Sequence, residues 1–199
     1  MFEVAEYIGI IAFAISGFFV AVRNKLDLLG ILIATFLTAL GGGIIRDIAV
    51  DRVPYTFSND YPAIIVLSVL ILLILFQFHK KQSIENKPLF IISDSIGLVS
   101  FSITGALIAI ENHFNLTGVL AISFITAVGG GIVRDVIINE IPFIFKTGFY
   151  GTVSLLMGIA IYFLNTYNLI SFLSLAIIFA VGVTIRVVAY YQKWKVPII

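Results

Sequence analysis

A gapless internal repeat constrains the fold of this chain more than any other feature of its sequence. Residues 13–57 align with residues 101–145, so that GGGIIRDI at 41–48 returns as GGGIVRDV at 129–136. The alignment also matches Asn24 with Asn112 and Pro54 with Pro142. Each copy places an arginine and an aspartate late in a long apolar run, where charges are costly. A fold for this chain therefore has to accommodate the same costly arrangement twice.

The apolar runs have the length of membrane-spanning helices. Seven of them come close to the roughly 20 residues that a bilayer requires: 4–22, 28–50, 61–78, 89–110, 116–138, 147–165 and 169–190. Only 12% of the residues are charged and 60% are hydrophobic, whereas about a quarter of the residues in a soluble domain are charged. The sequence therefore predicts an all-α integral membrane protein with seven transmembrane helices. The connections are short, so residues 1–199 are expected to form a single transmembrane domain.

Three spans in each copy predict an inverted arrangement. Repeat one covers about residues 4–78, repeat two about residues 89–165, and an extra seventh helix about residues 169–190. Because three is odd, the second repeat enters the membrane from the opposite side. The two repeats are then related by a pseudo-two-fold axis in the membrane plane. Such inverted repeats are common in transport proteins, whose pathway lies at the repeat interface.

The distribution of lysine and arginine predicts the orientation. If the spans alternate, one side receives Arg23, Lys25, Lys80, Lys81, Lys87, Lys146, Lys193 and Lys195, and the ends and loops of the other side have only Arg52. The positive-inside rule then places the N-terminus outside and the C-terminus in the cytoplasm of a cell inner (plasma) membrane. The N-terminal segment carries glutamates where a signal peptide would carry lysines, so we interpret it as a retained first span.

The glycine triplets have two interpretations. They comprise Gly41, Gly42 and Gly43 in the second span and Gly129, Gly130 and Gly131 in the fifth. Each glycine lowers helix propensity by about 1 kcal/mol relative to alanine, which favours a kink or an unwound turn. Close helix packing through small residues is the alternative. Because two triplets occur at symmetric depths, each before a charge, we expect kinks in both spans.

A stripe of small hydroxyl side chains precedes each arginine. Helical spacing places Thr35, Thr38, Gly42 and Arg46 on one face, and Ser123, Thr126, Gly130 and Arg134 repeat that face. Ser16 and Thr104 occupy matching positions in the first span of each repeat. The stripe predicts a transport pathway lined by hydroxyl groups. The alternative is that each hydroxyl group bonds to its own helix.

Arginine within a span indicates a functional site by default. Adjacent residues of a helix do not face each other, so the neighbouring pairs Arg46–Asp47 and Arg134–Asp135 should each require other partners. Glu6 and Asp94 occupy equivalent positions at the starts of the first and fourth spans. We therefore predict two ion pairs, Glu6 with Arg46 and Asp94 with Arg134, which either gate the pathway or only hold the helices together. Arg186 is expected to extend to the membrane surface.

Several classes of function have no basis in the sequence. The chain contains no cysteine, so neither disulfides nor thiolate metal sites can form. The net charge of +1 gives no reason to expect nucleic-acid binding. No nucleophile–base set or structural metal site stands out. We expect neither an enzyme nor a cofactor.

The motifs and the predicted topology resemble the prokaryotic branch of the trimeric intracellular cation (TRIC) channel family. The resemblance rests on seven spans, the three-span inverted repeat, and GGGIIRD and GGGIVRD in the second and fifth spans. It implies a homotrimer among membrane lipids, with a pore in each subunit and gating at glycine-kinked helices two and five. The transported ions would be potassium or sodium, with potassium preferred.

Two properties of family members, phosphoinositide binding and glycine transport, concern what else this chain could bind or carry. Animal members bind phosphoinositide near a Lys-Glu-Val motif, but this chain has IVRDV in the corresponding region, so the resemblance does not extend to phosphoinositide control. Some bacterial relatives are described as glycine transporters. The alternative function is therefore secondary transport of a small zwitterion such as glycine, with Arg46 or Arg134 binding its carboxylate.

Overall fold

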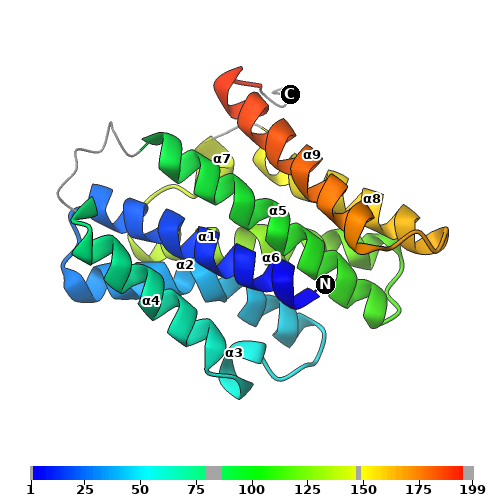
Figure 1. The fold of residues 1–199 in the computed structure, drawn as a ribbon, viewed down its shortest axis with the longest axis horizontal. Helices are drawn as coiled ribbons and strands as arrows, with labels where there is room; N and C mark the ends of the chain where they lie inside the picture. Colours follow the sequence, from blue (N-terminus) through cyan, green and yellow to red (C-terminus); the bar gives the residue numbers. More distant parts are fainter. Residues whose placement is uncertain (1, 79–86, 147–148, 195–199) are drawn as a thin grey trace.

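The described residues of the computed structural model, 2–78, 87–146 and 149–194, form helices joined by short turns. The elements are α1 (Phe2–Arg23), α2 (Leu28–Ala49), α3 (Tyr55–Ser58), α4 (Tyr61–Leu75), α5 (Lys87–Glu111), α6 (Leu116–Ile137), α7 (Phe143–Lys146), α8 (Tyr150–Thr166) and α9 (Phe172–Tyr191) (Figure 1). Lys80, Lys81 and Lys195, which contributed to the predicted orientation, lie outside the described residues.

Five helices identify a multi-pass membrane protein. α1, α2, α5, α6 and α9 are each long and apolar enough to cross a membrane. α4 and α8 have 15 and 17 residues, or about 23 and 26 Å at 1.5 Å per residue, compared with about 30 Å for the hydrocarbon core. The all-helical membrane fold is therefore observed, whereas the count of seven spans stays a prediction.

Equivalent residues begin and end the helices of the two copies. The Asp27 side chain accepts a hydrogen bond from the Gly30 amide at 2.7 Å at the start of α2, and Asn115 does the same for Gly118 at 3.0 Å at the start of α6. These caps satisfy amides that have no partner within the helix. Lys25 after α1 and His113 after α5 both have positive φ, 55° and 59°, as is common where a helix ends.

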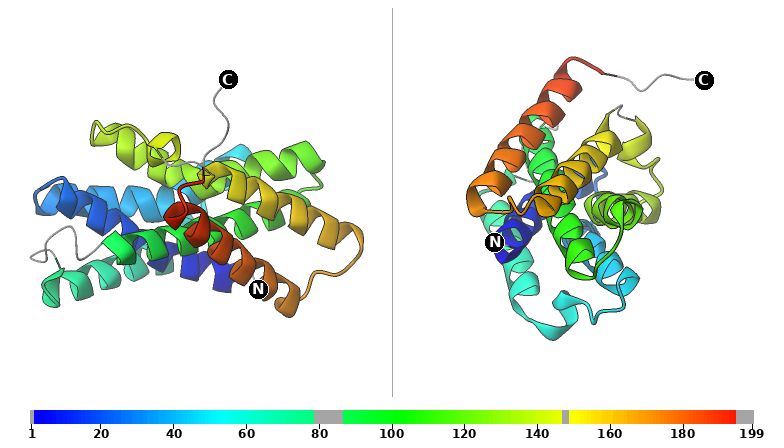
Figure 2. Two further views of the ribbon diagram at one scale, coloured as in Figure 1. Left: turned by 90° about the horizontal axis from the view of Figure 1, so that it is seen from above. Right: turned by 90° about the vertical axis from the view of Figure 1, so that its right-hand side faces the viewer.

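α1 and α5 pack against each other at the centre of the molecule and run antiparallel. A Cβ atom on Gly9 would lie 2.5 Å from the Phe101 ring, and one on Gly97 would lie 2.3 Å from the Phe13 ring. The rings of Phe13 and Phe101 pack edge to face, with centroids 5.2 Å apart. Around this pair, α4 packs against α1 and α9 against α5, on opposite sides of the molecule (Figures 1 and 2).

The glycine triplets lie where α2 and α6 cross. A Cβ atom on Gly42 would lie 2.2 Å from the Thr126 carbonyl oxygen, and one on Gly130 would lie 2.4 Å from the Thr38 carbonyl oxygen. Only glycine permits so close an approach of two backbones. The pairing of 42 with 126 and of 38 with 130 shows that these helices also run antiparallel. We call residues 41–43 of α2 and 129–131 of α6 the glycine seam.

Neither helix is unwound at its glycine triplet, whereas the expected kink in each helix stays a prediction. α2 and α6 each continue through their glycines, and no glycine among the described residues has a positive φ. Glycine is required at the centre of each triplet because a carbonyl group of the facing helix occupies the space where a Cβ atom would lie. Of the two interpretations drawn from the sequence, the structure supports close packing.

We predict that the glycine seam tolerates alanine at some positions and not at others. Gly42→Ala and Gly130→Ala should each lower the free energy of unfolding by about 1–3 kcal/mol, because the added methyl group overpacks a backbone contact. Gly131→Ala is the matched control, since its Cβ would lie no closer than 3.8 Å to a neighbouring atom. Thermal unfolding in detergent measures the differences. Equal losses at all three positions would show that the crossing is not tightly packed.

Candidate functional site

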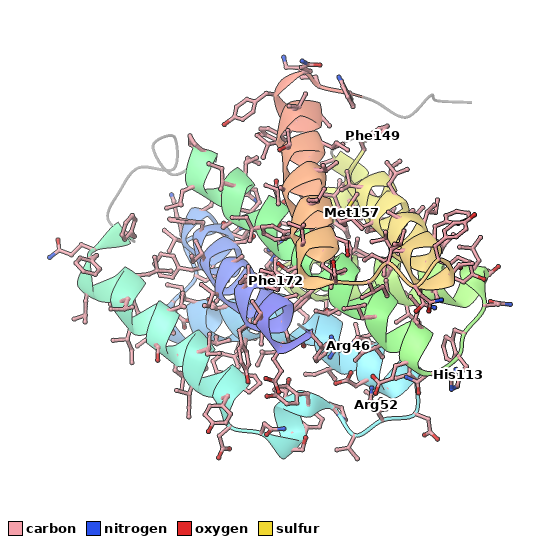
Figure 3. The ribbon with its side chains drawn as sticks, turned by 45° about the vertical axis from the view of Figure 1, so that its right-hand side comes forward. Arg46, Arg52, His113, Phe149, Met157 and Phe172 are labelled. Carbon is pink, nitrogen blue, oxygen red and sulfur yellow. The ribbon has the colours of Figure 1, made fainter. Side chains whose placement is uncertain are left out.

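Arg46 is the centre of a group of charged and polar residues that we call the Arg46 cluster (Glu6, Arg46, Asp47, Tyr55 and Thr104), and its three charged members are buried. The guanidinium group donates to both carboxylate oxygens of Glu6, at 2.7 and 3.1 Å, and to the Thr104 hydroxyl at 3.2 Å. Arg46 is 0% exposed and lies where the end of α2 comes close to the start of α1 (Figure 3). The expected contact between Arg46 and Glu6 is therefore present, and it joins α1, α2 and α5.

Each aspartate of the repeated motif binds the arginine before it, contrary to expectation. Nε donates to the aspartate Oδ1 at 2.8 Å both in Arg46–Asp47 and in Arg134–Asp135. The arginine side chain is long enough to fold back beside its own backbone, which the argument from helical spacing did not consider. The other oxygen of Asp47 accepts the Tyr55 amide at 2.8 Å, and that of Asp135 accepts the Phe143 amide at 2.7 Å. Each pair thereby holds the start of the following short helix, α3 or α7.

A second group of buried charges, which we call the Arg134 cluster, contains Asp94, Arg134, Asp135, Tyr150 and Arg186. The predicted ion pair between Asp94 and Arg134 is absent from it. Asp94 Oδ1 instead accepts the Ser16 hydroxyl at 3.2 Å, and neither Asp94 Oδ2 nor Arg134 Nη1 has a hydrogen-bond partner. Aspartate is one methylene shorter than the glutamate at the equivalent position 6, so the carboxylate reaches less far across the helix contact.

Arg186 lies inside the protein and does not extend to the membrane surface as expected. Its side chain has no exposed surface, and its Cζ lies 4.7 Å from the centroid of the Tyr150 ring and 5.8 Å from those of Phe143 and Tyr190. The packing of α9 against α5 turns the side chain inwards, where aromatic faces stabilise the cation. The only sequence signal for this residue was an arginine within an apolar run.

The hydroxyl side chains predicted to line a pathway are all buried in helix contacts. The buried set is Ser16, Thr35, Thr38, Thr104, Ser123 and Thr126, each 0% exposed. The hydroxyl groups of Thr35, Thr38 and Thr126 donate to the carbonyl four residues earlier, and that of Ser123 donates to the Ser102 and Ser154 carbonyls. In this conformation the three threonine hydroxyl groups therefore bond to the backbone of their own helices. A role of the stripe in transport stays a prediction.

Polar contacts also join the loops at the two ends of the bundle. Near the Arg46 cluster, the Tyr7 and Tyr55 hydroxyl groups are 2.9 Å apart, and this hydrogen bond raises the pKa of Tyr55 to about 12. At the other end, Glu140 binds Lys146 and lies 3.7 Å from Arg23, and the hydrogen bond from Lys146 lowers the pKa of the Glu140 carboxyl. Arg23 and Lys146 therefore lie at the same end, as expected from the alternation of spans.

We predict that the two motif arginines differ in their contribution to stability. Arg46→Gln should lower the free energy of unfolding by about 3 kcal/mol or more, because it leaves Glu6 and Asp47 buried without a cation. Arg134→Gln should lower the free energy of unfolding by less, because Asp135 still accepts the hydrogen bond from the Phe143 amide and Asp94 loses no hydrogen bond. Arg52→Gln, which breaks the exposed pair with Glu111, is the control and should cost under about 1 kcal/mol. Equal losses for Arg46→Gln and Arg134→Gln in thermal unfolding would contradict this.

Comparison with known proteins places this architecture in a family. The family model described as "Glycine transporter" matches residues 3–80 and 91–166. The UPF0126 membrane protein YvgT of Bacillus subtilis is 34% identical over 98% of this chain and 95% of its own length. The UPF0126 inner membrane protein YadS of Escherichia coli is 33% identical over 77% of this chain and 74% of its own.

Solved structures share the fold along the whole chain. A prokaryotic TRIC channel crystallised in 0.5 M KCl superimposes with a TM-score of 0.88 at 31% identity, covering 98% of both chains. A structure from work on conductance through TRIC cation channels superimposes with a TM-score of 0.85 at 34% identity, covering 100% of this chain and 97% of that one. The TRIC orthologue from Rhodobacter sphaeroides superimposes with a TM-score of 0.87 at 27% identity, covering 97% of this chain and 98% of the orthologue. This chain belongs to the prokaryotic TRIC channel family, whose members include the UPF0126 membrane proteins.

Proposed function

We propose that the protein is a potassium-preferring channel for monovalent cations, with a pore in each subunit of a homotrimer and a gate at the glycine seam. The structures that it resembles along its whole length are those of TRIC cation channels. The observation that carries the proposal is the direct contact of two backbones in the seam. That contact brings carbonyl oxygens of both helices to one place within the bilayer.

The carbonyl groups of Thr38 and Thr126 each face a glycine of the opposite helix, with no side chain between them. A carbonyl that accepts a helical hydrogen bond keeps a second lone pair, which here meets only a weak Cα–H donor. If α2 and α6 separate, these oxygens can bind a cation. Cation channels use carbonyl oxygens in this way to replace the hydration shell of the ion.

The charge clusters lie beyond opposite ends of the glycine seam. Arg46 follows Gly42 by one turn and Arg134 follows Gly130 by one turn, and the two helices run antiparallel. Arg46 joins α2 to α1 through Glu6, and Arg134 holds the start of α7 through Asp135, so we propose that the clusters latch the closed conformation. Glycines have no side chains to disengage, which keeps the opening of the seam between the latches inexpensive.

We also propose that α4 and α8 complete seven spans and that residues 4–78 and 89–165 are inverted repeats across the seam. The antiparallel direction of α1 with α5 and of α2 with α6 supports this arrangement. The N-terminus would lie outside and the C-terminus in the cytoplasm of the cell inner membrane.

The channel proposal predicts unitary currents from purified protein in a planar bilayer. With potassium on one side and sodium on the other, the reversal potential should show a preference for potassium. In a potassium gradient, the current should reverse near the potassium equilibrium potential. A silent bilayer, with protein shown to be inserted, would contradict the proposal.

A second prediction concerns the threonines beside the seam. The chain has no cysteine, so Thr38→Cys and Thr126→Cys each introduce one thiol of similar size. A small water-soluble thiol reagent should reduce the potassium current of both variants, because opening exposes these positions to water. Leu67→Cys, at an exposed site on α4, is the lipid-facing control and should leave the current unchanged. Unchanged currents in all three variants would mean that the stripe serves only packing.

Secondary transport of a small zwitterion is the second candidate function. Two observations favour it: the description of the matching family model and the unpaired donors of the Arg134 cluster. Saturable uptake of glycine into liposomes, without unitary currents, would support this candidate over the channel.

A further inference from the structure

We infer that the Arg134 cluster is a binding site for a small zwitterion, whose carboxylate binds Arg186 and Arg134 and whose ammonium group binds Asp94. This builds on the second candidate function, but it concerns binding alone. It holds whether the ligand is carried across the membrane or only modulates conduction.

The cluster has an excess of buried donors that no protein group satisfies. Arg134 Nη1 and the Nε, Nη1 and Nη2 atoms of Arg186 have no hydrogen-bond partner. Arg134 is 1% exposed and Arg186 0% exposed. Unpaired charged donors at such depth are unfavourable, because the aromatic faces around Arg186 stabilise its charge but accept no strong hydrogen bonds from its N–H groups. A guanidinium fork suits a carboxylate, which accepts two parallel hydrogen bonds from it.

The same cluster contains one unsatisfied acceptor. Asp94 is 2% exposed. Its Oδ1 atom accepts the Ser16 hydroxyl, its Oδ2 atom has no hydrogen-bond partner, and the Tyr150 hydroxyl lies beside the carboxylate. Both arginines act electrostatically on Asp94, yet neither forms an ion pair with it within 4.0 Å. A zwitterion that joins them offers its carboxylate to the arginines and its ammonium group to Asp94.

Charge balance favours a zwitterion over a simple anion. The cations Arg134 and Arg186 are balanced by Asp94 and Asp135, so the cluster is neutral when all four are ionised. A bound anion would leave a net negative charge in a medium of low dielectric constant, which is costly. A zwitterion satisfies the donors and the acceptor without changing the net charge.

In the Arg46 cluster, the equivalent region of the first repeat, the buried charged atoms all have hydrogen-bond partners. There, Glu6 accepts two hydrogen bonds from Arg46, and no side-chain atom of Glu6, Arg46 or Asp47 is buried without a partner. The Arg134 cluster differs in two ways: the acid is one methylene shorter, and α9 adds Arg186. The first repeat contains no equivalent of α9. We therefore assign ligand binding to one cluster only.

The test is equilibrium binding of radiolabelled glycine to purified wild-type protein in detergent, with acetate and methylammonium as competitors. Glycine should bind saturably, and each competitor should be at least about tenfold weaker than unlabelled glycine, because each offers only half of the contacts. Absence of saturable glycine binding to folded protein would overturn the inference. So would competition by acetate equal to that by glycine, which would identify a simple anion site.

Two substitutions separate the proposed contacts. Asp94→Asn should weaken glycine binding about tenfold or more while acetate binds at least as well as before, because the site becomes positive. Arg186→Gln should weaken glycine and acetate alike. Arg52→Gln, at an exposed ion pair far from the cluster, is the control and should leave glycine binding unchanged. Equal glycine affinity of wild-type protein and folded Arg186→Gln protein would overturn the inference.

Potassium currents recorded from the same preparation without glycine separate this inference from the channel proposal. A conducting protein that does not bind glycine overturns only the site. A protein that binds glycine but does not conduct overturns only the channel.

Discussion

The crossing of α2 and α6 is a contact between two backbones, and the positions of both charge clusters depend on it. Gly42 and Gly130 each leave room for a carbonyl of the opposite helix, so no side chain sets the distance between the helices. One turn further along each helix, Arg46 and Arg134 enter the protein at opposite ends of the contact. Each is then buried at a depth where a charge requires partners. The surrounding helices supply Glu6 and Thr104 for Arg46, but no equivalent pair for Arg134.

The two halves are therefore alike in backbone and different in chemistry. Both cap their second helix with a side-chain oxygen, and both use an aspartate to hold the next short helix. Only the first half satisfies its arginine completely. The second half has an aspartate in place of a glutamate and receives Arg186 from α9. The duplicated scaffold therefore contains one cluster with all its buried polar atoms paired and one cluster without.

Much of this fold could be predicted from the sequence, because apolar length and the repeat determine it. The site could be predicted only where residue type and position were sufficient, as for the contact between Glu6 and Arg46. Helical spacing excluded the contact of Arg46 with Asp47, since that argument ignores the reach of a long side chain. The pairing of Asp94 with Arg134 was inferred from the symmetry of the repeats. The aspartate side chain is one methylene shorter than that of Glu6, so its carboxylate does not reach the arginine. The inward direction of Arg186 depends on the packing of α9, which no local pattern specifies.

The central claim is that cations pass where α2 and α6 separate at the glycine seam. The most direct measurement is the potassium current of a protein in which that contact is locked. Gly41→Cys with Gly129→Cys places one thiol on each helix, at positions where a Cβ meets the facing helix at 3.2 and 3.1 Å without the severe overlap found at Gly42. Cross-linking the two thiols in a planar bilayer should abolish the current, and reduction or cleavage of the cross-link should restore it. An unchanged current through the cross-linked protein would place the pathway elsewhere and contradict this account.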